Sequence, residues 1–227
     1  MSVNVVPASV AFRIAFVPGV TLAKWTRIWA ERRPDVPLEV TMIGEGEQVA
    51  VLREGLADVA FVRPPVEREG LNVIPLYSEA PVVVVPKEHP IAAFEAVTLA
   101  DLAGETRQDA LLSGAPDALR DAVELVAAGV GVLVVPQSLA RLHARKDLTY
   151  RPVTDAAETQ IALAWPVQHT TELVEEFVGV VRGRTAQSSR GTPTPPKEKK
   201  PPARKTARKP VDAARARAAK ARRRRPR

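Results

Sequence analysis

Short apolar runs alternate with segments of helical periodicity throughout the chain from Phe12 to Val181. Two of these runs, "VVVVP" at 82–86 and "VLVVP" at 132–136, are apolar at every position, which is typical of strands buried on both faces of a sheet. Strands that alternate with helices in this way predict an α/β fold with largely parallel sheets.

The first strand and the first helix illustrate the pattern. "FRIAFV" (Phe12–Val17) is predicted to be a strand and Pro18–Gly19 the turn that follows it. A helix is predicted to begin at Thr21, whose hydroxyl can cap it, and to end before Pro34. Its apolar stripe consists of Leu22, Trp25, Ile28 and Trp29.

Together with the first strand, the other predicted strands form two clusters of three. Further strands are expected at "PLEVTMI", "ADVAFV", "APVVVVP", "GVGVLVVP" and "QIALAWP". Helices are expected around Val49, Leu52 and Leu56, at "TLADLAGE", from Pro116 to Gly129, at "QSLARLHAR" and at "TTELVEEFVGVVRG". Connections near 76–85 and 160–165 indicate two lobes.

The C-terminal segment 186–227, called here the basic segment, differs from the rest of the chain in charge. It contains 16 Lys and Arg residues and 2 acids, a net charge of +14, whereas residues 1–185 contain 17 Lys and Arg residues and 24 acids, a net charge of −7. Proline is frequent in the basic segment and apolar periodicity is absent, so it is predicted to be disordered. This asymmetry indicates a polyanionic partner.

The basic segment is expected to bind DNA without base specificity, because Lys and Arg that neutralise phosphates gain affinity from counterion release. It has no aromatic residue, which argues against stacking on single strands. RNA remains an alternative partner, and a solubilising appendage is the alternative role. The expected contacts are Lys197, Lys199, Lys200, Arg204, Lys205, Arg208, Lys209, Arg215, Arg217, Lys220, Arg222, Arg223, Arg224, Arg225 and Arg227.

Composition also restricts location and chemistry. The chain has no cysteine, so it has no disulfide framework and no thiolate zinc site. No apolar run approaches the roughly 20 residues that span a bilayer, and the N-terminus lacks the cationic start of a secretion signal. A cytoplasmic, nucleoid-associated protein without membrane contact is expected.

No catalytic constellation is present in the sequence. His89, His143 and His169 are scattered, and none has a spacing that pairs it with a serine nucleophile or a second metal ligand. The glycines of "AAGVGVLVVP" lead into a strand rather than a helix, the wrong order for a dinucleotide site. The sequence therefore predicts a non-enzymatic protein with no cofactor and no metal.

Three segments resemble the effector-binding region of LysR-type transcriptional regulators in order, spacing and residue character. They are "FRIAFVPGVTLAKWTRIWAERRPDVPLEVTMIGEGEQVAVLREGLADVAFVRPP", "LYSEAPVVVVPKEHPIAAFEAVTLADLAGE" and "ELVAAGVGVLVVPQSLARL". The resemblance implies a periplasmic-binding-protein-like (type II) fold, in which two α/β lobes are hinged by two crossing strands around a small ligand. It implies an N-terminal extension over 1–11 and a domain over 12–185, with lobe I at about 12–76 plus the C-terminal helix and lobe II at about 77–160.

The chain departs from the family pattern in two places. Only eleven residues precede the first predicted strand, so the winged helix-turn-helix and linker helix of the family are expected to be absent. Between "LADLAGE" and "DALRDAVELVAAG" stands only "TRQDALLSGAP", where the family usually has another strand and helix, so a shortened second lobe is expected. The basic segment is not a family feature.

The resemblance also implies a ligand site at the loops after the first three strands. The candidate residues are Pro18, Gly19, Val20, Thr21, Gly44, Glu45, Gly46 and Arg63. A helix N-terminus after a strand suits a carboxylate, although Thr21 and Gly19 are equally explained as a cap and a turn residue. Glu45 and Glu47 would repel an anion; Arg63 could bind a ligand carboxylate or lie exposed beside two prolines.

These observations predict a sensor of a small molecule, with a small organic acid as the candidate effector, that is held on DNA by the basic segment. The alternative is an interaction or dimerisation module that binds no small molecule and is the partner of a separate regulator. A homodimer through the domain is compatible with both.

Overall fold

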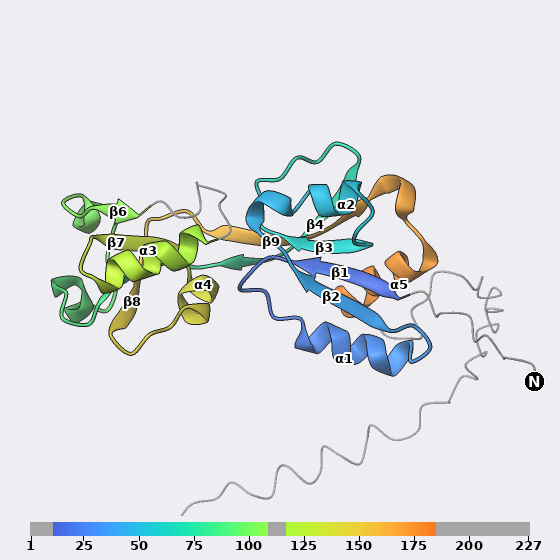
Figure 1. Cartoon of the computed structure of the whole chain (residues 1–227), viewed down its shortest axis with the longest axis horizontal. Helices are drawn as coiled ribbons and strands as arrows, with labels where there is room; N and C mark the ends of the chain where they lie inside the picture. The colour runs from blue at the N-terminus through green and yellow to red at the C-terminus, as the bar shows by residue number, and fades with distance from the viewer. Residues whose placement is uncertain (1–10, 109–116, 185–227) are drawn as a thin grey trace, which may run out of the picture. The chain divides into compact units, whose positions relative to one another are not determined.

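The computed structural model describes residues 11–108 and 117–184, which form two β-sheets with their covering helices (Figure 1). The predictions for the N-terminal extension and the basic segment lie outside these residues, as does most of the short segment expected between the second-lobe elements.

The first sheet has five strands in the order β2-β1-β3-β9-β4. Their bounds are Leu38–Met42 (β2), Phe12–Phe16 (β1), Val59–Val62 (β3), Thr159–Pro166 (β9) and Leu71–Glu79 (β4). The helices beside this sheet are α1 (Ala23–Arg32), α2 (Ala50–Arg53) and α5 (Glu172–Val181).

Aromatic side chains form the core between the first sheet and helices α1 and α5. Phe12 of β1 stacks on Trp29 of α1, with ring centroids 4.9 Å apart, and also contacts Phe177 of α5 at 5.3 Å. Phe61 of β3 stacks on Trp25 at 4.7 Å. The apolar stripe predicted for α1 therefore packs against the sheet, and offset or edge contacts of this kind add to the stabilisation that burial provides.

The second sheet has four strands in the order β6-β7-β5-β8. Their bounds are Arg107–Gln108 (β6), Val132–Pro136 (β7), Pro81–Pro86 (β5) and Leu148–Pro152 (β8). Helices α3 (Ala118–Ala127) and α4 (Gln137–Leu142) pack on one face, and the 3-10 turns η2 (Pro90–Ala93) and η3 (Ala100–Leu102) pack on the other.

The valine run of β5 is buried on both faces, as predicted. Val82 and Val84 belong to the apolar cluster under α3 and α4, whereas Val83 and Val85 belong to the cluster under η2 and η3. Alternate residues of a strand point to opposite faces, so an unbroken apolar run supplies both cores at once.

The prediction of largely parallel sheets is wrong. The pairs β1–β2, β1–β3 and β6–β7 are parallel, but β3–β9, β4–β9, β5–β7 and β5–β8 are antiparallel. Strand β4 leads from the first sheet to the second and β9 leads back, so the two paired strands run in opposite directions. An apolar run shows burial on both faces but not the direction of the neighbouring strand.

Two local predictions also need correction. Helix α1 begins at Ala23 after Leu22, and its first turn has no side-chain cap, so Thr21 is exposed and does not cap the helix. Leu56 lies outside the short helix α2 and is exposed. The sequence pattern also missed β4, β6 and β8 as separate strands.

The described ranges 11–108 and 117–184 contain neither a membrane-spanning helix nor a metal-binding cluster. No helix there combines the length and the apolar character that crossing a membrane requires. Within the same ranges, His, Asp and Glu side chains form no group of three or more with a metal-binding arrangement.

Candidate functional site

The chain passes from the first sheet to the second at Ala80, between β4 and β5. Strands β4 and β9 are paired there, with Glu79 opposite Thr159. Helix α4 of the second sheet begins at the same place, because the backbone N–H of Gln137 donates to the carbonyl of Ala80 at 2.9 Å. We call this region the junction; the residues below converge on it.

Arg63 follows the end of β3 and is the central side chain of the junction. Its Nε donates to Glu79 at 2.9 Å, and one terminal nitrogen donates to the carbonyl of Pro18 at 3.1 Å. The other terminal nitrogen pairs with Glu45. The side chains of Arg63 and Glu79 are only 3% and 4% exposed, so this is a buried ion pair with a second, partly exposed carboxylate beside it.

Glu79 connects the two sheets through its carboxylate. It accepts hydrogen bonds from the hydroxyl of Ser138, on helix α4 of the second sheet, and from the hydroxyl of Thr159 at 3.2 Å. A buried carboxylate is tolerated when its lone pairs are satisfied and a cation is adjacent. Four donor groups, two from Arg63 and two hydroxyls, meet that requirement.

The electrostatics of the junction follow from burial and charge. Burial alone would lower the pKa of Arg63, but the hydrogen bonds and charges of Glu79 and Glu45 outweigh it and raise the pKa above its ordinary value. Burial also raises the pKa of the nearby Tyr77 phenol, and the negative charge of Glu79 adds to that rise. Arg63 therefore stays charged in the folded protein.

The loop that carries Glu45 is ordered by its own hydrogen bonds. Glu47 accepts from the backbone N–H of Gly44 at 2.8 Å, and Gln48 donates to the carbonyl of Glu45 at 2.8 Å. The other end of the Gln48 amide accepts from the backbone N–H of Arg63. The loop and the Arg63 backbone are thus held together by hydrogen bonds within the protein.

Gly19 allows the two sheets to approach closely at the junction. Its φ is +89°, and a Cβ at this position would lie 2.6 Å from the Ser138 hydroxyl oxygen. Only glycine combines that backbone conformation with that contact.

The structure brings together some of the sequence-predicted site residues. Pro18, Gly19, Glu45 and Arg63 meet at the junction, with Gly44 and Gly46 flanking Glu45 in the same loop. Val20 is buried in the core and Thr21 is exposed. The possibility that Arg63 is exposed is wrong, because its guanidinium is enclosed by acceptors.

Sequence reasoning missed Glu79, Ser138, Thr159 and Gln48. Glu79 is the one acid between Leu71 and the valine run of β5, a polar residue just before a buried strand, and that position is the signal that could have marked it. Ser138 gives no comparable signal, because it is 59 residues from Glu79 in the chain.

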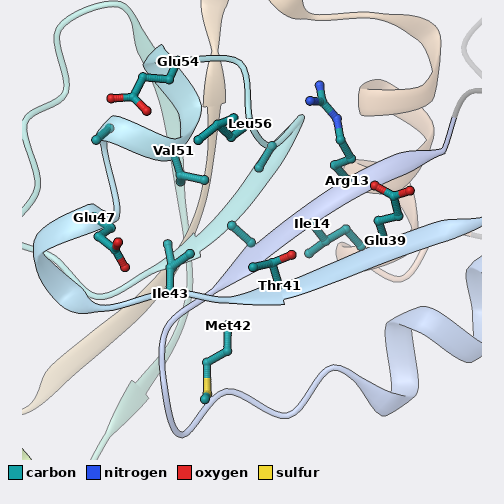
Figure 2. Close-up of a pocket in the computed structure, with 13 residues that line it drawn as sticks. Arg13, Ile14, Glu39, Thr41, Met42, Ile43, Glu47, Val51, Glu54 and Leu56 are labelled. Atoms are coloured by element: carbon teal, nitrogen blue, oxygen red, sulfur yellow. The ribbon is translucent and has the colours of Figure 1, made fainter. Parts of the chain in front are cut away.

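A second feature is a groove of about 440 Å³ on the first sheet, between β1, β2 and α2 (Figure 2). Its floor is apolar and includes Ala15, Ile43 and Val51. Arg13 and Glu39 stand at one end and Glu47 at the other, whereas Met42 points away from the groove. Arg13 is already paired with Asp58 at 2.8 Å.

The groove is separate from the junction, although the two share one short turn. The 3-10 turn η1 (Glu45–Glu47) presents Glu45 to Arg63 and Glu47 to the groove. The groove is rimmed by carboxylates that face solvent, whereas the junction holds buried charges drawn from both sheets. The junction is therefore the stronger candidate site.

Comparison with known proteins identifies relatives over most of the described chain. The family model described as "LysR substrate binding domain" matches residues 9–108 and 116–186. The match is interrupted where the sequence predicted a shortened segment.

Curated relatives are transcriptional regulators, not enzymes. A probable hydrogen peroxide-inducible genes activator of Mycobacterium avium is 34% identical over 140 residues, covering 52% of this chain and 45% of that protein. The HTH-type transcriptional regulator AlsR of Bacillus subtilis is 25% identical over 216 residues, covering 79% of this chain and 69% of AlsR. The chain thus spans less than half the length of the mycobacterial relative it matches.

Solved structures show the same fold. The BenM effector binding domain with its effector benzoate matches with a TM-score of 0.64 at 23% identity, covering 77% of this chain and 92% of that one. An OxyR mutant from Corynebacterium glutamicum matches with a TM-score of 0.63, also at 23% identity, covering 78% of this chain and 66% of that one. The predicted α/β, periplasmic-binding-protein-like fold is confirmed.

Proposed function

Because the chain belongs to the LysR substrate binding domain family, we propose that it senses a small organic molecule at the junction and takes part in transcription regulation without catalysing a reaction. One observation supports this most: charged and hydroxyl side chains from both sheets converge on Arg63 and Glu79. A molecule bound there contacts both sheets, so its affinity depends on how they are arranged.

The proposed ligand contacts are the loops predicted from the sequence together with the residues the structure adds. They are Pro18, Gly19, Val20, Thr21, Gly44, Glu45, Gly46 and Arg63 from the first sheet, with Ser138 and Thr159 completing the set. In this proposal lobe I comprises residues of about 12–76 together with the C-terminal helix α5, lobe II comprises about 77–160, and β4 and β9 connect the two.

A thermal-shift screen of the full chain tests the sensing function. Small metabolites that bind only the folded state raise the melting temperature, with a stabilisation of about 2.7 kcal/mol at a ligand concentration of 100 times Kd. Hits are then repeated with Ser138→Ala, which should weaken binding, and with Thr98→Ala as a control far from the junction. Hits of equal affinity in Ser138→Ala and the wild-type chain would place the binding site elsewhere.

The alternative function, an interaction or dimerisation module, is favoured by one observation. On the edge strand β2, Val40 is 44% exposed and Met42 is 61% exposed. Glu39 and Thr41, the neighbours of Val40 in the chain, are exposed as well. Large exposed apolar side chains side by side on an edge strand suit a protein partner. If the protein forms stable dimers and no metabolite of the panel raises its melting temperature, the interaction module is favoured over the sensor.

The second part of the proposal concerns the basic segment 186–227. With a net charge of +14, it is proposed to bind DNA through phosphate contacts, without base readout and in association with the nucleoid. If about ten cations engage duplex DNA, log affinity should fall with log salt at a slope of about −9. RNA is the competing partner.

Duplex binding by the full chain and by residues 1–185 tests this part. The full chain should bind random-sequence duplexes of equal length with equal affinity, and removal of the basic segment should abolish binding at low salt. Equal affinity of the two chains would refute the proposal. Stronger binding to RNA than to duplex DNA of the same length would assign the segment to RNA.

A further inference from the structure

The groove between β1, β2 and α2 carries an excess of negative charge. Glu39, Glu47 and Glu54 stand around it (Figure 2). Within the described residues, no Lys or Arg side chain forms an ion pair with any of these three carboxylates. Arg13 also lines the groove, but its charge is balanced by Asp58, which leaves three negative charges there.

The groove also has apolar surface that an occupant can cover. Ala15, Ile43 and Val51 are buried beneath it, whereas Leu56 at its border is 60% exposed. A volume of about 440 Å³ holds a few side chains. An occupant that suits the groove therefore combines apolar surface with positive charge.

The basic segment of this chain has that combination. It carries a net charge of +14, and in the stretch 213–222, "AARARAAKAR", small apolar side chains are interspersed with cations. The aliphatic stems of Arg and Lys can cover apolar surface while their charged heads reach carboxylates at the border. Residues 1–185 have a net charge of −7, so the charge complementarity is not confined to the groove.

The place where the described chain ends indicates which copy supplies the segment. Alternate residues of β1 point to opposite faces of the sheet: Phe12 packs on α1 and α5, whereas Arg13 and Ala15 line the groove. Figure 1 shows α1 and α2 on opposite sides of this sheet. Arg184, the last described residue, follows α5, and its carbonyl accepts a hydrogen bond from Arg32 at the end of α1. The groove is thus on the other face, which a segment from a second copy can reach directly.

From these observations we infer that the groove between β1, β2 and α2 binds the basic segment of a second copy of this chain, with residues 213–222 as the part that enters it. Glu39, Glu47 and Glu54 pair with its cations, and the apolar floor contacts its alanines and the stems of its arginines. The surfaces that meet are different on the two copies, so the association is head to tail.

The groove and DNA compete for the same cations, because the residues expected to contact phosphates are also those that pair with the groove carboxylates. This competition rests on the DNA binding proposed above, whereas association in the absence of DNA does not. Loss of DNA binding with intact association would refute the DNA proposal alone. Loss of association with intact DNA binding would refute the inference about the groove alone.

Sedimentation velocity of the full chain, free of nucleic acid, tests the inference. The average mass should rise with protein concentration at about 0.05 M salt. It should return to that of a single chain at about 1 M salt, where exposed charges are screened beyond about 3 Å. A mass that stays that of a single chain at every concentration in low salt would overturn the inference. So would an association that persists undiminished in high salt, which would point to the apolar edge of β2 instead.

Neutralising the groove locates the binding site. The triple variant Glu39→Gln, Glu47→Gln, Glu54→Gln should weaken association about tenfold, because three exposed ion pairs are lost. Glutamine keeps a side-chain carbonyl that can accept from the backbone N–H of Gly44, as Glu47 does, so the η1 turn is retained. Leu56→Lys changes an exposed position, places a cation at the groove and should also weaken association.

A matched control removes the same charge elsewhere. It is the triple variant Glu88→Gln, Glu95→Gln, Glu158→Gln, whose three carboxylates are exposed and do not line the groove. Association that is weakened in the groove variant but retained in this control supports the site. Equal weakening in the two triple variants would overturn it. Unchanged association in both the groove variant and Leu56→Lys would overturn it as well.

Discussion

The two sheets reach a similar degree of burial by different means. The first packs five aromatic rings into one core between the strands and helices α1 and α5. The second packs valine and leucine into two smaller clusters, one on each face. A few large side chains therefore dominate the first core, whereas the second distributes its burial over many small ones.

This difference teaches where each sheet is sensitive to change. Removing one aromatic ring from the first core opens a large cavity. The second core loses less with any single side chain, because its burial is spread over many residues. It also contains a close backbone approach, since a Cβ on Gly131 would lie 2.0 Å from the carbonyl oxygen of Thr106. The junction belongs to neither core and depends on charge.

The largest effect is expected for Trp29→Ala in the first core. The ring is fully buried and its indole N–H donates to the carbonyl of Val36 at 3.0 Å. Its loss should lower the free energy of unfolding by about 3–5 kcal/mol, whereas Val126→Ala in the second core should cost about 2 kcal/mol. Urea denaturation followed by circular dichroism measures both. Equal losses of unfolding free energy in Trp29→Ala and Val126→Ala would contradict the difference between the two cores.

The next effect is expected at the junction, for Arg63→Met. Glu79 would be left buried beside two hydroxyls but no cation, at a cost of about 3 kcal/mol in unfolding free energy. Adding Glu79→Leu should recover most of the loss. Arg53→Met, which breaks the exposed pair with Glu67, should have little effect by the same measurement. A double variant no more stable than Arg63→Met would contradict the charge argument.

A third prediction concerns two glycines of the second sheet with similar backbones. Gly129 and Gly131 have φ values of +77° and +76°, but a Cβ on Gly131 would lie 2.0 Å from the carbonyl oxygen of Thr106, whereas a Cβ on Gly129 would contact nothing. Gly129→Ala should cost about 1 kcal/mol for backbone strain alone, and Gly131→Ala about 1–3 kcal/mol more. Equal thermal stability of the two variants would show that the close approach to Thr106 is not needed.

The smallest effect is a pH dependence in the second sheet. Burial lowers the pKa of His143, at the end of α4, below its ordinary value of 6.5. As the pH falls, the His143 imidazole therefore becomes protonated at a higher pH in the unfolded chain than in the folded protein. The free energy of unfolding decreases as the pH falls from about 6.5 through the folded-state pKa. His143→Gln should flatten the unfolding free energy between pH 7.5 and 5. An unchanged slope would assign the dependence to other groups.

The local apolar pattern of the sequence predicted most of the helices and strands, because each residue's polarity indicates whether its side chain is buried. The stripe of α1 and the valine run of β5 are both where the sequence indicated. Strand direction was not recorded in this way, and β4 was missed because Pro75 and a mixed burial pattern obscure it. Thr21 was assigned as a cap from its residue type, although the helix begins two residues later.

The site was predicted in part, for a similar reason. The loops after the first three strands carry Pro18, Glu45 and Arg63, and the family resemblance located them. Glu79 and Ser138 come from different sheets, and no spacing in the sequence reveals that they meet. The buried ion pair between Arg63 and Glu79, and the hydroxyl of Ser138 that donates to it, become visible only in the structure.

The pairing of Glu79 with Thr159 also has a mechanical consequence. These residues stand where the chain crosses from one sheet to the other, so any swing of one sheet against the other must bend the backbone within a residue or two of the buried carboxylate. Glu79 lies next to Ala80, the residue at which the chain crosses between the sheets, so it is close to the pivot of any such movement. It restrains the turning of that pivot through the hydrogen bonds that Glu79 accepts from Ser138 and Thr159.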